Sequence, residues 1–247
     1  LRIAHIENHV ADTAIAITQA RLQLAHGQHE QALALLERIH RQQPQHEYVL
    51  KLLMAVYQQL KDWDNLLTIL GIMKKKKYLS AEQAETLTSQ AYLGKCHKLQ
   101  HKKADYDLWI TQWNTIPDTY HVNAEFLHLF IPVAMNVDPA LAEQLLCKSL
   151  KKQWDDELIT LYGLIPHRDI RHPLAMGETW LKQRPQNAHL LLTLARLCLQ
   201  GQLWGKAEQY LNASIESSAT PEAYYELGKL HQSLAETDKS FACFERG

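Results

Sequence analysis

Residues 187–217 read NAHLLLTLARLCLQGQLWGKAEQYLNASIES, and this stretch decides the fold. Apolar and small residues recur at helical spacing on both sides of Gly201, which marks a turn. They are Leu191, Leu194 and Ala195 before it, and Trp204, Ala207 and Leu211 after it. Ala195 and Ala207 stand twelve positions apart, one in each half. The stretch therefore predicts two amphipathic helices that meet at small residues.

The same twelve-residue relation occurs elsewhere in the chain. It joins Ala20 with Ala32, Met54 with Leu66, and Gly228 with Ser240. Ala32 and Leu66 are 34 residues apart, and Ala207 and Ser240 are 33 residues apart. A period of about 34 residues is typical of stacked helix pairs of the tetratricopeptide (TPR) type. We therefore expect an all-α fold, a right-handed solenoid of TPR-like helix pairs.

A continuous solenoid would make residues 1–247 a single superhelical domain. The regular and degenerate repeats are expected in these ranges: regular at 13–77 and 187–247, degenerate at 80–184, where the spacing drifts. About six or seven helix pairs are expected, one of them a partial pair at Leu1–Val10. Proline should end or kink a helix from within. We therefore expect Pro132 to interrupt the helix predicted at His121–Asn136.

Helix boundaries in the middle of the chain follow from capping residues. Ser80, followed three positions later by Gln83, predicts a capping box at the start of a helix that runs to Lys98. The segment Ala104–Trp113 is expected to be its partner. Asp155 or Asp156 is expected to cap a helix rather than to form an acid–base pair, because adjacent helical residues point about 100° apart.

Composition excludes several classes of protein. Lys and Arg number 26 against 27 Asp and Glu, which argues against a nucleic-acid binder. The four cysteines lie far apart without a CxxC pair, so we expect free thiols in a reducing compartment. No run of about 18 apolar residues predicts a membrane span. The chain begins with Leu1, which we interpret as a segment whose membrane anchor lies upstream and is absent here.

One local run carries more than the repeat pattern. It is KKQWDDEL at 151–158, accompanied by RLQLA at 21–25 and QAYLG at 90–94. With these runs, most of residues 1–247 resembles the HemY family. Its members carry two N-terminal inner-membrane helices followed by a TPR domain, and are associated with late porphyrin and haem biosynthesis in proteobacteria. The resemblance implies anchoring in the bacterial inner membrane, with the soluble domain on the cytoplasmic side and haem-biosynthesis enzymes among its protein partners.

The architecture indicates where a partner would bind. First helices of stacked pairs line the concave face of a solenoid. The residues that flank the small positions are expected to face into it: Arg21, Tyr48, Lys51, Gln58, His189, Arg196, Tyr225 and Lys229. This mixture of basic and aromatic groups suits an acidic or carboxylate-bearing segment, bound by charge-assisted hydrogen bonds from arginine.

No catalytic or phosphate-binding motif is recognisable, so we expect a non-enzymatic scaffold without a cofactor. Two alternatives remain open. In the first, the protein is a porphyrin or haem carrier in which Cys96, His97 or His101 ligates the metal. In the second, it is a TPR assembly factor for envelope proteins unrelated to haem.

Two further features have both a structural and a functional interpretation. The lysines of Lys74–Lys77 fit the end of a helix, or contact with anionic lipid or an acidic partner. Trp109 and Trp113 lie one helical turn apart, and fit core packing or an exposed stacking platform.

Overall fold

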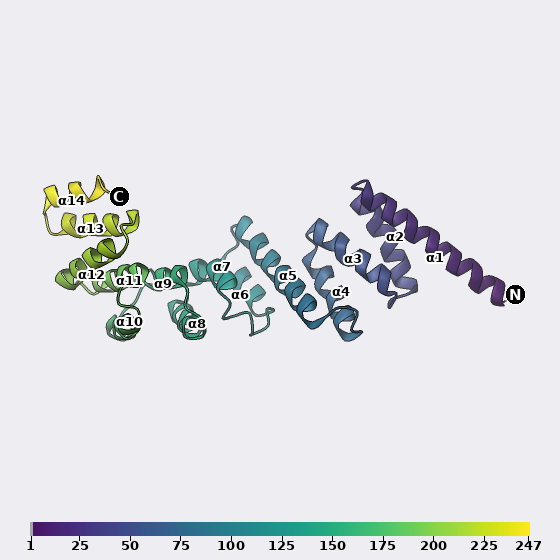
Figure 1. Ribbon diagram of the computed structural model, residues 1–247, viewed down its shortest axis with the longest axis horizontal. Coiled ribbons are helices and arrows are strands. Elements are labelled where there is room, and N and C mark those ends of the chain that lie inside the picture. The colour runs from purple at the N-terminus through teal and green to yellow at the C-terminus, as the bar shows by residue number, and fades with distance from the viewer. Residues whose placement is uncertain (1) are drawn as a thin grey trace. The chain divides into compact units, whose positions relative to one another are not determined.

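Few helix-breaking residues interrupt this chain, and the structure is correspondingly helical. The computed structural model describes residues 2–247 and, from residue 12 onward, their side chains. These residues form fourteen α-helices and no strand (Figure 1). The predicted all-α fold is therefore confirmed as a repeat of helix pairs. The chain divides into two compact units, Leu1–His101 and Lys102–Gly247. A single continuous domain stays a prediction.

The first unit contains five helices, each packed against the next. They are α1 (Arg2–Ala25), α2 (His29–Gln42), α3 (Glu47–Leu60), α4 (Trp63–Lys75) and α5 (Ala81–His101). Fully buried side chains from four of them form the core: Ala20, Leu36, Leu50, Leu53, Leu66 and Met73. The partial pair expected at Leu1–Val10 is wrong, because residues 2–10 extend α1. No glycine or proline precedes Gly27 to end that helix earlier.

Capping explains where α5 begins. The Ser80 hydroxyl accepts a hydrogen bond from the Gln83 N–H at 3.1 Å. The Gln83 side chain in turn accepts from the Ser80 N–H at 3.2 Å. The predicted capping box is thus confirmed, and it satisfies two N–H groups that have no partner inside the helix.

Four of the turns inside helix pairs share one left-handed geometry. In each, an N–H bonds to the carbonyl five residues earlier, as in a Schellman motif. These bonds are Gln28 to Gln23, Asp62 to Tyr57, Leu203 to Cys198, and Glu236 to His231, at 2.8–2.9 Å. The residue before each donor has a positive φ: Gly27 (73°), Lys61 (54°), Gln202 (57°) and Ala235 (60°). Three of the four are not glycine.

The second unit contains the remaining nine described helices. They are α6 (Tyr106–Trp113), α7 (Ala124–Ala134), α8 (Pro139–Lys152), α9 (Asp156–Tyr162), α10 (Arg171–Gln183), α11 (Ala188–Gln200), α12 (Trp204–Ser217), α13 (Pro221–Ser233) and α14 (Thr237–Phe244). The first helices of successive pairs pack on one another, α7 on α9, α9 on α11 and α11 on α13. In Figure 1, α7, α9 and α11 form one row, with α8 and α10 on the same side of it.

The small residues occupy the positions where helices approach most closely. Ala195 and Ala207 are fully buried, as are Ala20 and Ala32 in the first unit. In the last pair, the Ser240 hydroxyl donates to the Gly228 carbonyl at 2.9 Å. A Cβ at Gly228 would lie 2.6 Å from the Phe244 ring. The repeated register therefore reflects helix–helix distance.

Three expectations for the middle of the chain have clear outcomes. The helix α6, expected to partner α5, belongs to the second unit and packs on α7. Pro132 lies inside α7, which ends two residues later at Ala134. Trp109 and Trp113 are buried, and the Trp113 ring stacks 4.0 Å from that of Phe130. Core packing is thus the correct interpretation of this tryptophan pair.

Candidate partner-binding groove

One face of α11 forms the floor of a groove in the second unit. His189, Leu192, Arg196 and Leu199 follow one another at three- and four-residue intervals and therefore lie along one side of the helix. Two hollows open along this side, one at each end of α11. Together these hollows and the face of α11 between them constitute what we call the α11 groove.

The first hollow, of about 350 Å³, we call the histidine hollow. Four helices contribute to its walls or rim: α7, α9, α11 and the start of α13. Its lining residues are His128, Glu157, Thr160, Leu161, Ala188, His189, Leu192, Thr220 and Glu222. Ala188, at the start of α11, has the smallest of the lining side chains.

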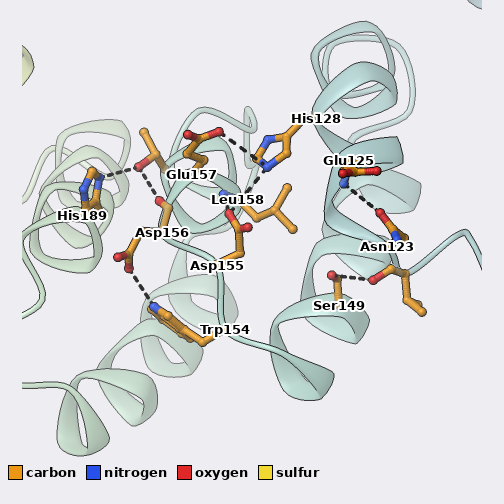
Figure 2. Close-up of polar contacts among 12 residues, drawn as sticks. Asn123, Glu125, His128, Ser149, Trp154, Asp155, Asp156, Glu157, Leu158 and His189 are labelled. Atoms are coloured by element: carbon orange, nitrogen blue, oxygen red, sulfur yellow. Dashed lines mark hydrogen bonds and ion pairs between the residues drawn. The ribbon is translucent and has the colours of Figure 1, made fainter. Parts of the chain in front are cut away.

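Polar contacts organise the histidine hollow (Figure 2). The Nε2 atom of His128 lies 3.6 Å from one carboxylate oxygen of Asp155 and 3.6 Å from one of Glu157. Asp155 also caps α9, since it accepts from the Leu158 N–H at 2.8 Å. The Thr160 hydroxyl lies 3.2 Å from Nδ1 of His189. Asp155, Glu157 and Glu222 therefore place three carboxylates at this end of the groove.

The KKQWDDEL run holds the frame of this hollow together. Asp156 accepts a hydrogen bond from the Trp154 indole at 2.8 Å and from the Asn187 amide at 2.7 Å, which ties α9 to the start of α11. The Arg184 guanidinium covers the Trp154 ring at 4.2 Å. Partial burial alone would raise the pKa of Asp156, but these hydrogen bonds outweigh it and hold the pKa below its ordinary value. The predicted capping role of this acidic pair is confirmed for Asp155.

The second hollow, of about 360 Å³, we call the arginine hollow. It lies between the loop after α9, helix α11, the start of α12 and helix α13. Its lining residues are Gly163, Leu164, Arg196, Leu199, Gln200, Trp204, Glu226, Lys229, Leu230 and Ser233. The Gln200 amide donates to the carbonyls of Gly163 and Ile165 at 3.2 and 3.0 Å, which fixes the loop after α9 against α11.

Arg196 is the central charged group of the arginine hollow. Its side chain is only 10% exposed, and its Nε donates to Glu226 at 3.1 Å. The Nη1 atom is buried without a hydrogen-bond partner among the described residues. Lys229 lies 3.8 Å from the other oxygen of Glu226 and is half exposed. The hollow thus carries two cations and one anion.

The structure brings together three of the eight predicted partner-binding residues. His189 lines the histidine hollow, while Arg196 and Lys229 line the arginine hollow. Tyr225 is 55% exposed on the neighbouring helix α13, and its ring centre lies 5.4 Å from the Lys229 ammonium. These four residues belong to the second unit.

The other four predicted residues lie in the first unit. Arg21 and Tyr48 are exposed and Gln58 is half-buried, whereas Lys51 is exposed and paired with Glu47 at 2.5 Å. A hollow of about 450 Å³ in this unit is lined by residues of α1 and α2 and by none of α3. It is lined by Asp12, Thr13, Ile15, Ala16, Gln19, Arg38, Ile39 and Gln42.

The proposed haem or metal ligands do not converge. Cys96 is fully buried, and burial raises the pKa of its thiol to about 11. His97 and His101 are exposed on the surface of α5. Among the described side chains, no group of three His, Cys, Asp or Glu is placed to hold a metal ion.

Sequence reasoning missed His128, Glu157, Gln200 and Glu226. Glu226 lies 30 residues after Arg196. A repeat of about 34 residues less one helical turn of about four residues gives the same separation, so this spacing is the signal that could have identified the pair. Lys206 and Glu178, paired at 2.6 Å, show a similar offset of 28 residues. Charges of opposite sign at such offsets indicate pairs between neighbouring repeats.

Comparisons with known proteins identify no family for this chain. No protein-family model matches the chain, and no curated protein matches it. Among solved structures, TTC0263, a thermophilic TPR protein of Thermus thermophilus, is 15% identical over 95% of this chain and 89% of its own, with a TM-score of 0.30. Yeast Tom70 is 11% identical over 94% of this chain and 61% of its own, with a TM-score of 0.39.

A third structure, a MamA RS-1 ArsTM double mutant, is 10% identical over 95% of this chain and 91% of its own, with a TM-score of 0.26. The fold class therefore rests on the helix pairs themselves: the chain is an all-α repeat protein. Within the described residues, no helix has the length and apolar character needed to cross a bilayer.

Proposed function

We propose that this chain is a protein-interaction domain that binds an extended segment of a partner protein in the α11 groove. The observation that carries the proposal is the alignment of both hollows along one helix. From His189 to Gln200, α11 rises about 16 Å at about 1.5 Å per residue. An extended peptide of about five residues spans the same length.

Hydrogen bonds between neighbouring elements hold the groove in place. Asp156 connects α9 with α11, and Gln200 connects α11 with the loop after α9. A surface held by such bonds changes little on binding, so the partner segment bears most of the entropic cost of ordering. Repeat proteins generally bind partners on extended surfaces of this kind.

A more specific proposal comes from the resemblance of the KKQWDDEL run to the HemY family. In this proposal the domain scaffolds late porphyrin and haem biosynthesis, tethered to the bacterial inner membrane through helices upstream of Leu1 and exposed on the cytoplasmic side. Its partners would then be haem-biosynthesis enzymes. The sequence run supports this proposal, and no metal or cofactor is required by it.

Photo-crosslinking in cells tests the binding site. A benzoylphenylalanine replaces Thr160 or Leu199, which line the two hollows, or Lys182 or Asn212, which lie on α10 and α12 outside both hollows. We expect the groove positions to give the same discrete partner adduct and the control positions to give none. Equal adducts from all four positions would refute a specific groove.

The identity of the adduct tests the finer proposal. Mass spectrometry of the adduct should identify an enzyme of porphyrin or haem synthesis. An adduct with envelope proteins alone would replace the haem role by envelope assembly and would leave the groove itself in place.

A further inference from the structure

We propose that the α11 groove selects segments by charge polarity, with a partner carboxylate in the arginine hollow and a basic partner side chain in the histidine hollow. This inference rests on the proposed function and specifies the chemistry of the segment bound there. Four observations support it: the incompletely satisfied guanidinium of Arg196, the competing Glu226, the opposite charge of the two hollows, and the distance between them.

Arg196 has capacity for a second carboxylate. A guanidinium has five N–H donors, and in the described structure Glu226 accepts from Nε only. Because the unpartnered Nη1 donor is buried, a small shift of the side chain that brings it to an incoming acceptor would relieve the penalty of leaving it unpaired. The planar fork can bond one carboxylate through Nε and another through its Nη groups. The half-exposed Lys229 adds a second cation at the rim.

Glu226 already occupies part of the subsite. It lies within ion-pair distance of both cations of the hollow, 3.1 Å from Arg196 and 3.8 Å from Lys229. It therefore competes with an incoming carboxylate, yet it also orients the guanidinium. The two cations and one anion leave the hollow with a net charge of +1, which attracts an acidic group. Leu164, Leu199 and Trp204 provide apolar walls beside it.

The histidine hollow has the opposite charge. Glu157 and Glu222 line it, and Asp155 lies beside His128. His189 and Arg196 are seven residues apart on α11, which is about 10 Å along the helix axis. About three residues of extended chain cover that distance. The occupant is therefore an extended peptide in which Lys or Arg stands about three residues from Asp, Glu or a C-terminal carboxylate.

The experiment is a selection from random octapeptides displayed on yeast, against the whole purified chain. One library ends in a free C-terminus, and the other continues into a Gly-Ser-Gly tail. We expect acidic residues to be enriched in both libraries, with a basic residue about three positions away. Enrichment in the free library alone would assign the carboxylate to the chain terminus and would equally support the subsite.

Variants then identify the groups responsible. With the best selected peptide, Arg196→Gln should weaken binding tenfold or more and Lys229→Gln a few-fold. The control Lys148→Gln, an exposed lysine on α8 that lines neither hollow, should leave affinity unchanged. Glu226→Gln should tighten binding several-fold, because it removes the competing charge. Loss of folding cannot produce that gain, and circular dichroism melts verify the fold of each variant.

Several outcomes would overturn the inference. Peptides selected without acidic residues, binding indifferent to Arg196→Gln, or binding weakened by Glu226→Gln would each refute the carboxylate subsite while the groove as a peptide site stands. Displacement of the peptide by micromolar protoporphyrin IX would reassign the hollow to a propionate ligand. Failure to select any peptide would instead refute the proposed function.

Discussion

Burial governs the chemistry of individual cysteines. Cys96 and Cys198 are fully buried, and burial raises the pKa of each thiol to about 11. Cys243 is only half-buried near the end of the chain, and burial raises its pKa as well. Because the thiolate is the reactive form, both accessibility and acidity suppress reaction at the first two residues.

The thiols should therefore react in a definite order. At pH 8, iodoacetamide should alkylate Cys243 well before Cys96 or Cys198 in the native chain, and all the cysteines should react at similar rates in concentrated guanidinium chloride. Peptide mass spectrometry over time measures this order. Fast native alkylation of Cys96 would contradict its placement in the core.

Asp156 links the KKQWDDEL run to the start of the groove helix. Asp156→Ala removes an acceptor from Trp154 and Asn187 and should lower the free energy of unfolding by about 1 kcal/mol. This is below the usual range of about 1.5–3 kcal/mol for hydrogen bonds to a charged group, because the carboxylate is exposed. Its pKa is lowered in the folded state, so the charged form is the stabilising one. The contribution is present above the ordinary pKa of 3.8 and is lost as the pH falls through the lowered folded value.

Urea denaturation at pH 7 and pH 3 tests this dependence. The difference between wild type and Asp156→Ala should be smaller at pH 3. Glu216→Ala, which removes an exposed carboxylate on α12, serves as the matched control and should change little at either pH. An equal difference at both pH values would show that the charge of Asp156 plays no part.

At the scale of elements, two helical glycines have opposite roles. A Cβ at Gly71, exposed in α4, would meet no atom within 4 Å. A Cβ at Gly94 in α5 would overlap the indole of Trp63 at the start of α4. The first glycine only weakens its helix, whereas the second permits α4 and α5 to pack.

Gly71→Ala should therefore raise the free energy of unfolding by about 0.5–1 kcal/mol, since alanine costs less backbone entropy in a helix. Gly94→Ala should lower it by about 1–3 kcal/mol through overpacking against Trp63. Chemical denaturation of the two single variants measures both effects. The same sign for both would contradict the packing described for α4 and α5.

Much of the element structure was predictable because its causes are local. The Ser80–Gln83 spacing determined the start of α5, and the repeat register predicted where Ala195 and Ala207 would be buried. The start of α1 was not predictable, because no glycine or proline between Arg2 and Gly27 marks a boundary between residues 2–12 and the rest of the helix. The assignment of α6 was missed because a short helix can pack on either neighbour, and sequence spacing does not decide which.

The binding surface was only partly predictable for a different reason. The register of first helices selected His189 and Arg196, which line the two hollows, but it selected Tyr48 and Lys51 of α3 equally, and these line none of the hollows described above. A hollow depends on which side chains of neighbouring helices meet, as those of Thr160, His189 and Glu222 do at the histidine hollow. Such conditions arise from three-dimensional packing between repeats and leave no periodic signal.

At the scale of the whole molecule, stability should be regional. In repeat proteins each element is stabilised mainly by its neighbours. Gly94→Ala should therefore accelerate amide hydrogen exchange in α4 and α5, and leave exchange in α11–α13 unchanged. Hydrogen-exchange mass spectrometry resolves the two regions. Faster exchange along the entire chain would instead favour the single cooperative domain that the sequence predicts.

The left-handed turns affect how many mutations this protein can tolerate. Lys61, Gln202 and Ala235 occupy a conformation that costs a non-glycine residue about 1–2 kcal/mol. Gly27 already avoids that cost at the equivalent turn. Glycine at the other three turns should raise thermostability in independent steps, because distant sites add. A chain stabilised in this way could tolerate mutations in the α11 groove that would otherwise unfold it, and could thereby acquire new partners.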